Sequence, residues 1–281
     1  RNHSSAASDV YKRQVIDTGV DVNHPDLVNN LNVGLATNTI FLQNPNDVTD
    51  NHGHGTHVAG IIGAVGNNQT GVVGVNWDVE IVPIKAFDDI NGDGVAVATH
   101  FDILDGIDYA INVAQADIIN ASWGASSGPL TNVWKTVIDQ HPEKLFVAAA
   151  GNQGVDIDVA GNAVFPASFD SPNIISVAAT DHNDNLSSFS NFGASVDLAA
   201  PGGSVIPGNG PGSSTDIRNI YSTLPSDDYG YSAGTSAAAA YVSGAAALML
   251  GTRRARNAIT GQPDLDALEL KDKVLLSLIH I

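Results

Sequence analysis

The sequence predicts an α/β fold in which a mostly parallel central sheet is covered by helices on both faces. Short apolar runs typical of strands alternate with longer segments of helical periodicity. The 28 glycines and 12 prolines indicate many tight turns between short elements, which disfavours a helical bundle. A chain of 281 residues can bury one large core. We therefore expect a single folded domain.

Four strands and four helices are expected from these patterns. The strands are the apolar runs 81–84, 118–121, 145–150 and 174–177. The helices are 101–114, where apolar residues recur at helical spacing, 133–140, 236–250 and 265–276. Parallel sheets of this kind bind ligands beyond the carboxyl ends of their strands. Functional residues are therefore expected where the strands end.

The charge balance and the missing cysteines exclude several classes of function. Twelve basic residues stand against 30 acidic ones, which gives a formal net charge of −18. Nucleic acids and anionic membrane surfaces attract a cationic face, so neither is an expected partner. Without cysteine the chain has no disulfide, thiolate metal site or thiol nucleophile. No apolar run reaches the ~18 residues of a membrane span.

The two ends differ from the body of the chain. Residues 1–14 are polar and lack periodicity, and only Val15 and Ile16 precede Asp17, which leaves little of a first strand. Residues 5–14 and 276–281 resemble translated sequencing-adapter read-through in metagenomic assemblies. Our hypothesis is that residues 15–274 form the domain, while 1–14 and 275–281 are non-native. The alternative is a natural disordered arm and tail.

Three short motifs carry the residue types of a serine nucleophile and its base. Asp17 precedes a Thr-Gly turn, His54 precedes Gly-Thr-His-Val-Ala-Gly, and Ser236 ends Gly-Thr-Ser. A serine hydroxyl needs a histidine to accept its proton, and the histidine needs a carboxylate to hold its tautomer. Each motif alone is weak evidence for a catalytic site. A metal site using His52 or His57 is the competing interpretation, but the His-Glu-x-x-His pattern is absent.

Together the motifs, in the order Asp, His, Ser, resemble the subtilisin-like serine peptidase family. A fourth segment, Ala149-Ala150-Gly151-Asn152, resembles the family's oxyanion segment. The resemblance implies a serine endopeptidase catalytic domain over residues 15–274 that forms an acyl-enzyme. Ser236 would attack, His54 would move the proton and Asp17 would orient His54. The amide of Asn152 and the backbone N–H of Ser236 would hold the oxyanion.

The resemblance also implies where a polypeptide substrate binds. The segment containing Ser122, Trp123 and Gly124 resembles the family strand that pairs with an extended peptide. Ala150 and Gly151 would complete the walls of the S1 pocket, which receives the side chain before the cleaved bond. Val164 stands where many relatives carry glycine. A branched side chain there predicts a short pocket and a preference for small P1 residues.

A calcium ion is the implied cofactor. The run Gly66-Asn67-Asn68-Gln69-Thr70-Gly71-Val72 resembles the family's tight calcium loop. Asp26 and Asn68 would give side-chain oxygens, and Gly66, Thr70 and Val72 would give carbonyls. One usual ligand comes from an N-terminal segment that is missing or replaced here, so the alternative is an empty surface loop. The acidic run 88–94 lacks the closing Glu of a helix–loop–helix site and is interpreted as a solvated turn.

The resemblance also bears on how the protein is made, and the chain departs from the family pattern just after the proposed nucleophile. The resemblance implies a secreted monomer made with a propeptide upstream. Ala237 and Ala240 replace the Met and Pro that relatives carry after the nucleophile, and alanine preserves a helix there. Two other classes stay open. One is a catalytically inactive relative that keeps the fold as a binding module, and the other is a structural calcium-binding protein.

Overall fold

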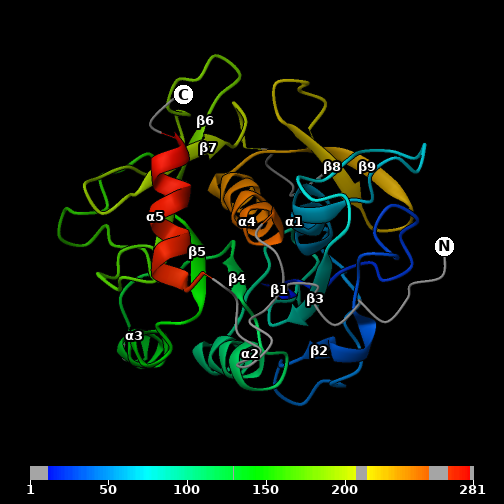
Figure 1. The fold of residues 1–281 in the computed structure, drawn as a ribbon, viewed down its shortest axis with the longest axis horizontal. Coiled ribbons are helices and arrows are strands. Elements are labelled where there is room, and N and C mark those ends of the chain that lie inside the picture. Colours follow the sequence, from blue (N-terminus) through cyan, green and yellow to red (C-terminus); the bar gives the residue numbers. More distant parts are fainter. Residues whose placement is uncertain (1–11, 129, 207–213, 253–264, 279–281) are drawn as a thin grey trace.

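A seven-stranded parallel sheet forms the centre of the molecule, in the order β2-β3-β1-β4-β5-β6-β7 (Figure 1). The computed structural model describes residues 12–128, 130–206, 214–252 and 265–278. Every neighbouring pair in this sheet is parallel, as expected. The strands are β1 (Lys12–Asp17), β2 (Thr37–Asn38), β3 (Glu80–Lys85), β4 (Ile118–Ala121), β5 (Leu145–Ala149), β6 (Ile174–Thr180) and β7 (Leu198–Pro201).

Helices cover both faces of the sheet, which confirms the predicted α/β class (Figure 1). Helices α2 and α3 pack on one face, and α1, α4 and α5 pack on the other. No helix among the described residues is long and apolar enough to cross a membrane. The bounds are α1 (His54–Gly63), α2 (His100–Asn112), α3 (Thr131–Gln140), α4 (Thr235–Thr252) and α5 (Ala267–Leu278), with a short 3-10 helix η2 (Val33–Leu35).

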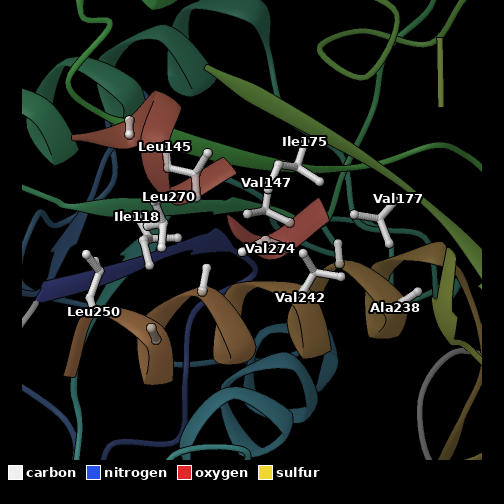
Figure 2. Packing of buried hydrophobic residues seen from close by; sticks show 14 of the residues in the cluster. Ile118, Leu145, Val147, Ile175, Val177, Ala238, Val242, Leu250, Leu270 and Val274 are labelled. Atoms are coloured by element: carbon white, nitrogen blue, oxygen red, sulfur yellow. The ribbon is translucent and has the colours of Figure 1, made fainter. Parts of the chain in front are cut away.

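Helix α4 runs through the core on the α1 side of the sheet. Its alanine-rich sequence favours a helix and lets the backbone approach the strands closely. Figure 2 shows Ala238 and Val242 of α4 facing Val147 and Val177 of the sheet, all almost fully buried. Burying a valine side chain contributes about 1.5–3 kcal/mol. This packing fixes the first turn of α4, where Ser236 lies.

The first strand is longer than the sequence indicated. Residues 12–14, expected to lie outside the fold, form the first half of β1 and pair with both β3 and β4. Arg13 and Gln14 are buried, and Arg13 Nη2 donates to Ala247 O at 2.7 Å. Backbone pairing on both sides therefore overrides the polarity of these side chains. Similarly, α5 continues to Leu278, through residues expected to belong to a tail.

An antiparallel hairpin, β8 (Ile220–Leu224) and β9 (Asp228–Ser232), lies before α4 and was not expected. Two buried hydroxyls of β8 tie it to α1. Ser222 Oγ donates to His57 O at 2.9 Å, and Thr223 Oγ1 donates to Thr56 O at 2.7 Å. A Cβ on Gly60 would lie 2.2 Å from Thr223 Oγ1, so only glycine allows this approach. The hairpin thus holds α1 beside the start of α4.

Candidate active site

Asp17 and His54 meet at the carboxyl end of β1. Asp17 is the last residue of β1 and His54 is the first of α1, and Asp17 Oδ1 lies 2.6 Å from His54 Nδ1. A Cβ on Gly55 would lie 2.0 Å from Gly19 O, so only glycine lets α1 begin this close to the turn after β1. Gly19 itself has a left-handed φ of +104°. Glycines in both motifs therefore make the pair possible.

Opposing effects act on the ionisation of His54. Burial lowers the pKa of His54, but the Asp17 carboxylate and the hydrogen bond it accepts raise it, with a further contribution from Asp50. The net result is a pKa above the usual histidine value. Asp17 Oδ1 also accepts the Thr18 N–H at 2.8 Å, whereas the buried Oδ2 has no hydrogen-bond partner among the described residues. The pair therefore favours the protonated imidazolium.

Ser236 lies in the first turn of α4 and is joined to the cleft through Ser122. It follows Gly234 and Thr235, and its hydroxyl donates to Ser122 O at 2.9 Å. The Ser122 hydroxyl donates in return to Ser236 O at 2.8 Å. Ser122 lines one cleft with Asp17 and His54. Within the described part of the chain, no hydrogen bond joins the Ser236 hydroxyl to His54, because that hydroxyl is directed at Ser122.

Asn152 follows β5 and is oriented by Thr235. Its side-chain oxygen accepts the Thr235 N–H at 2.8 Å and the Thr235 hydroxyl at 3.0 Å. Gly151 N–H donates to that same hydroxyl at 3.1 Å, with Gly151 at a left-handed φ of +101°. Oδ1 accepts both of these bonds, and Nδ2 has no hydrogen-bond partner in the part of the chain that the structure describes. A Cβ on Gly234 would lie 3.3 Å from this Nδ2, so Nδ2 lies beside Gly234, just before the start of α4.

The cleft in front of Asp17 and His54 has a volume of about 310 Å³. Ser122, Trp123 and Gly124, from the segment expected to bind the substrate peptide, line it. The other residues lining it are Thr18, His52, Phe87, Gly94, Val95 and Ala96. A larger apolar cavity of about 590 Å³ lies between β7, α4 and α5, and no residue of the Asp17–His54–Ser236 set lines it.

Val164 occupies the space between the predicted walls of the S1 pocket. A Cβ added to Gly124 would lie 2.4 Å from Val164 Cγ1, and one added to Gly151 would lie 3.2 Å from Val164 Cγ2. The Val164 side chain therefore lies between the Gly124 and Gly151 backbones. Ala150, the neighbouring wall residue, is buried. The antiparallel pairing of Ala125 with Phe165 fixes this arrangement, with N···O distances of 2.9 and 2.8 Å.

The other two motif histidines have structural surroundings. His57 is buried in α1, bonds to Ile220 O at 3.1 Å through Nε2, and has its pKa lowered to about 4, chiefly by burial. His52, which we expected to be exposed, is half-buried, and its Nε2 lies 3.0 Å from Gly94 O. Among the described residues, no cluster of three His, Cys, Asp or Glu side chains could hold a metal ion. The metallopeptidase interpretation therefore has no support.

The predicted calcium loop lies against Asp26, which is fully buried. Asp26 Oδ1 accepts Asn68 Nδ2 at 2.6 Å and Oδ2 accepts Val72 N at 2.8 Å. Tyr229 OH also contacts Oδ2, at 3.3 Å, and burial together with the Asp26 charge raises the pKa of Tyr229 to about 12. This carboxylate is therefore surrounded by donors.

Other features of the loop fit a hard cation. The carbonyls of Gly66, Thr70 and Val72 have no hydrogen-bond donor among the described residues. Asn68 is the residue that does not yet match, because its Oδ1 accepts Thr70 N at 3.0 Å while its nitrogen faces Asp26. Rotating that amide would give Asp26 and Asn68 oxygens on one side of the loop. Only with this amide turned would Asp26, Asn68 and the three carbonyls all present oxygens to a calcium ion.

Three residues at the site were not predicted to have a role. Thr18 and Asp50 hold the turn after β1 to the first turn of α1, and Thr235 orients Asn152. Thr18 and Thr235 lie inside the quoted motifs, next to the residues that were singled out. Asp50 stands four residues before His54 without a spacing rule to mark it. Their roles depend on contacts between segments far apart in the chain.

Comparisons with known proteins assign the chain to a family. Residues 14–268 match the Subtilase family of peptidases (Peptidase_S8). The thermophilic serine proteinase of Bacillus sp. (strain AK1) is 38% identical over 235 residues, which cover 84% of this chain and 51% of the relative. Thermitase of Thermoactinomyces vulgaris is 36% identical over 248 residues, covering 88% of this chain and 77% of the relative. The chain thus spans between half and about three quarters of these two relatives.

The solved structures lead to the same family. A cold adapted subtilisin-like serine proteinase superposes with a TM-score of 0.71 at 28% identity, over 94% of this chain and 81% of that one. On the family match, the identities and the shared fold, this chain belongs to the Subtilase family of subtilisin-like serine peptidases.

Proposed function

We propose that the chain is the catalytic domain of a serine endopeptidase, with Ser236 as nucleophile, His54 as general base and Asp17 as its orienting carboxylate. The observation that carries the proposal is the 2.6 Å Asp17–His54 hydrogen bond beside a cleft that Ser122 also lines. A buried carboxylate paired with a histidine is what a serine nucleophile requires. Subtilase relatives named as serine proteinases support it.

Catalysis begins when the Ser236 hydroxyl turns from Ser122 O towards His54. His54 accepts the hydroxyl proton as Ser236 Oγ attacks the substrate carbonyl, and Asp17 stabilises the imidazolium that forms. The free Nδ2 of Asn152 and the Ser236 N–H donate to the developing oxyanion. His54 then gives its proton to the leaving amine, and water hydrolyses the acyl-enzyme by the same steps in reverse.

The proposed substrates are polypeptides bound in extended form along Ser122, Trp123 and Gly124. Backbone pairing to this segment would supply affinity independent of sequence, and the pockets would supply selectivity. Val164 lies between Gly124 and Gly151, so the S1 pocket would be shortened at its base. A small P1 residue such as alanine is therefore the proposed preference.

Calcium is the proposed structural cofactor, held by Asp26, Asn68 and the carbonyls of Gly66, Thr70 and Val72. When bound, the ion would neutralise the buried Asp26 charge and stiffen the loop that follows α1. By its family we further propose a secreted, monomeric enzyme made with an upstream propeptide, without nucleic-acid or membrane partners. The formal net charge of −18 supports the last point.

Hydrolysis of a short peptide p-nitroanilide with alanine at P1 tests the proposed activity. The wild-type chain should release nitroaniline, and Ser236→Ala and His54→Ala should each lower turnover by about 10⁴-fold or more. Circular dichroism establishes that each variant is folded. A folded wild type that leaves peptides intact at the rate of its Ser236→Ala variant would instead indicate an inactive relative that serves as a binding module.

A further inference from the structure

Asp50 is a buried carboxylate close to the catalytic residues that the chemistry above does not use. It is 4% exposed and lies in the segment that leads into α1. Its oxygens accept five hydrogen bonds, from the hydroxyls of Thr18 and Thr56 and from the N–H groups of His52, Gly53 and Thr56, at 2.6–3.1 Å. Burying an unpaired polar group is costly, and these donors offset that cost for the Asp50 carboxyl group.

The contact with Thr18 ties Asp50 to the catalytic aspartate. The Thr18 hydroxyl donates to Asp50 Oδ1 at 2.8 Å and accepts Gly55 N–H at 2.9 Å. The Thr18 carbonyl accepts the buried Lys85 Nζ at 2.8 Å. Both polar ends of Thr18 are thus fixed. Because its hydroxyl proton is committed to Asp50, it does not reach Asp17 Oδ2, and Asp17 is left to bond through Oδ1 to Thr18 N and to His54.

The remaining contacts tie Asp50 to the histidine. Gly53 N–H and Thr56 N–H belong to the first turn of α1, whose free amides no intrahelical carbonyl can accept. Asp50 accepts them at 2.8 Å each, in the position where a negative charge also meets the positive end of the helix dipole. The backbone that carries His54 is therefore anchored to the same carboxylate as the turn that carries Asp17.

We propose that Asp50 is a positioning residue of the proposed peptidase: it joins the turn after β1 to the first turn of α1, so that Asp17 Oδ1 meets His54 Nδ1. The inference rests on the function proposed above. It assigns Asp50 a catalytic consequence beyond holding the helix start. Disturbing Asp50 should move both the rate and the ionisation of His54.

Among the described residues, a small set of charged or titratable groups surrounds His54. Asp17 faces it from β1, Asp50 from the segment before α1 and His57 from the next turn of α1. The His52 ring lies with its centroid 6.2 Å from that of His54. Both Asp17 and Asp50 raise the pKa of His54, after the opposing effect of burial. Removing the Asp50 charge should therefore lower the pH at which His54 titrates, with Asp17 still present.

Asp102 provides a matched control. It is also buried, at 3% exposure, and its carboxylate also caps a helix start, accepting Thr99 N, Thr99 Oγ1 and Phe41 N at 2.7–2.9 Å. It belongs to α2, which packs on the opposite face of the sheet from α1. Asp50→Asn and Asp102→Asn therefore remove the same kind of group, one beside the proposed triad and one remote from it.

The experiment compares wild type, Asp50→Asn and Asp102→Asn in three measurements. These are the thermal midpoint, kcat and KM for the alanyl anilide, and the NMR titration of His54. Both variants should lose stability. Only Asp50→Asn should lower kcat, by about tenfold or more at similar KM, and shift the His54 titration to lower pH. If Asp50→Asn does not fold, Thr18→Val removes the link to the Asp17 turn and should lower kcat in the same sense.

Two results would overturn the proposal. One is an Asp50→Asn variant whose kcat and His54 titration match those of Asp102→Asn. The other is an unfolded Asp50→Asn variant together with a folded Thr18→Val variant of wild-type kcat. If the wild type shows no turnover, the proposed activity fails separately, and the His54 titration alone then decides whether Asp50 positions the pair.

Discussion

Ser236 and Ser122 are joined by two reciprocal hydrogen bonds, in which each hydroxyl donates to the main-chain carbonyl of the other residue. The O···O distances are 2.9 Å from Ser236 Oγ and 2.8 Å from Ser122 Oγ. Asn120 supports them, since its Nδ2 donates to Ser122 Oγ and its Oδ1 accepts the Ser243 hydroxyl, both at 2.8 Å. The end of β4 and the first turn of α4 are thereby locked together. The proposed nucleophile is thus fixed to the strand that a substrate would follow.

Asn152 and Thr235 should contribute unequally to turnover. Asn152→Ala removes the proposed oxyanion donor and should lower kcat by about 10²–10³-fold, a magnitude measured for this donor in a subtilisin, a member of the same family. Thr235→Val keeps the Thr235 N–H bond to Asn152 and removes only the hydroxyl bonds, so a smaller loss is expected. Steady-state kinetics on the alanyl anilide measures both. Equal losses would contradict the division of roles.

Activity should fall on acidification through a pKa above the usual histidine value of about 6.5. The reason is that neutral His54 is the required base, and Asp17 and Asp50 outweigh burial in raising the pKa of His54. Asp17→Asn should lower both the apparent pKa and kcat. The kcat/KM profile against pH measures this. A profile centred below that of a free histidine would contradict the geometry of the pair.

Stability should decline below neutral pH because of His57. Burial lowers its pKa to about 4, so between the unfolded value of about 6.5 and pH 4 the unfolded chain binds a proton that the folded chain does not. Stability contributed by neutral His57 is therefore lost as the pH falls through this window, up to roughly 3 kcal/mol. The raised pKa of His54 acts in the opposite sense. NMR titration should show His57 neutral at pH 5; a protonated ring at that pH would refute the assignment.

Replacing Val164 should change the P1 preference. Val164→Gly removes the side chain between Gly124 and Gly151 and opens the pocket base. We expect wild type to prefer alanine over phenylalanine at P1, and the variant to gain about 10–100-fold in kcat/KM for phenylalanine relative to alanine. Val159→Gly, at a valine 54% exposed, is the control. A strong wild-type preference for phenylalanine would show that Val164 does not limit the pocket.

Calcium should stabilise the chain through Asp26. The thermal midpoint of the wild type should rise with calcium and fall in EDTA, because a cation bound only to the folded state adds stability. Asp26→Asn should abolish the response. Asp93→Asn, in the acidic turn at 88–94, should keep it, since Asp93 is exposed. A response lost in Asp93→Asn and kept in Asp26→Asn would place the ion in the acidic turn instead.

The sequence predicted those elements whose pattern is strong over their whole length. The apolar run 118–121 coincides with β4, and the expected helix at 133–140 lies within α3. The alanine-rich segment after Ser236 became α4, with ends within a turn of those expected. In each case burial on the expected face and local propensity agree, which is why the pattern was sufficient.

Elements whose local sequence conflicts with their position were missed. The first half of β1 carries the polar side chains of Lys12, Arg13 and Gln14 in a central strand, where sheet pairing decides the structure. The β8–β9 hairpin turns through Ser226 and Asp227 at left-handed φ values of 69° and 59°, without the Asn-Gly or Asp-Gly signal of such turns. Strand β7, Leu198–Pro201, is only four residues long and alternates half-buried and exposed positions, so it is shorter and less buried than its neighbour β6.

The residues of the proposed site likewise divide into those that the sequence predicted and those that it did not. The residues that meet substrate in the proposed mechanism lie in short motifs and could be named from them. The residues that orient these groups could not. Asp50 and Thr235 act across separations of 32 and 83 residues, on Thr18 and Asn152 respectively. Such contacts exist only once the strands and helices are assembled.

Fluorophosphonate labelling tests the central claim most directly, because the probe reacts only with a serine activated by its neighbours. The purified chain would be labelled with calcium present, beside Ser236→Ala and with circular dichroism as the measure of folding. We predict stoichiometric labelling of the wild type at Ser236, located by mass spectrometry, and none in the variant. A folded wild type that stays unlabelled would contradict an activated Ser236 and leave the inactive binding module as the function of this fold.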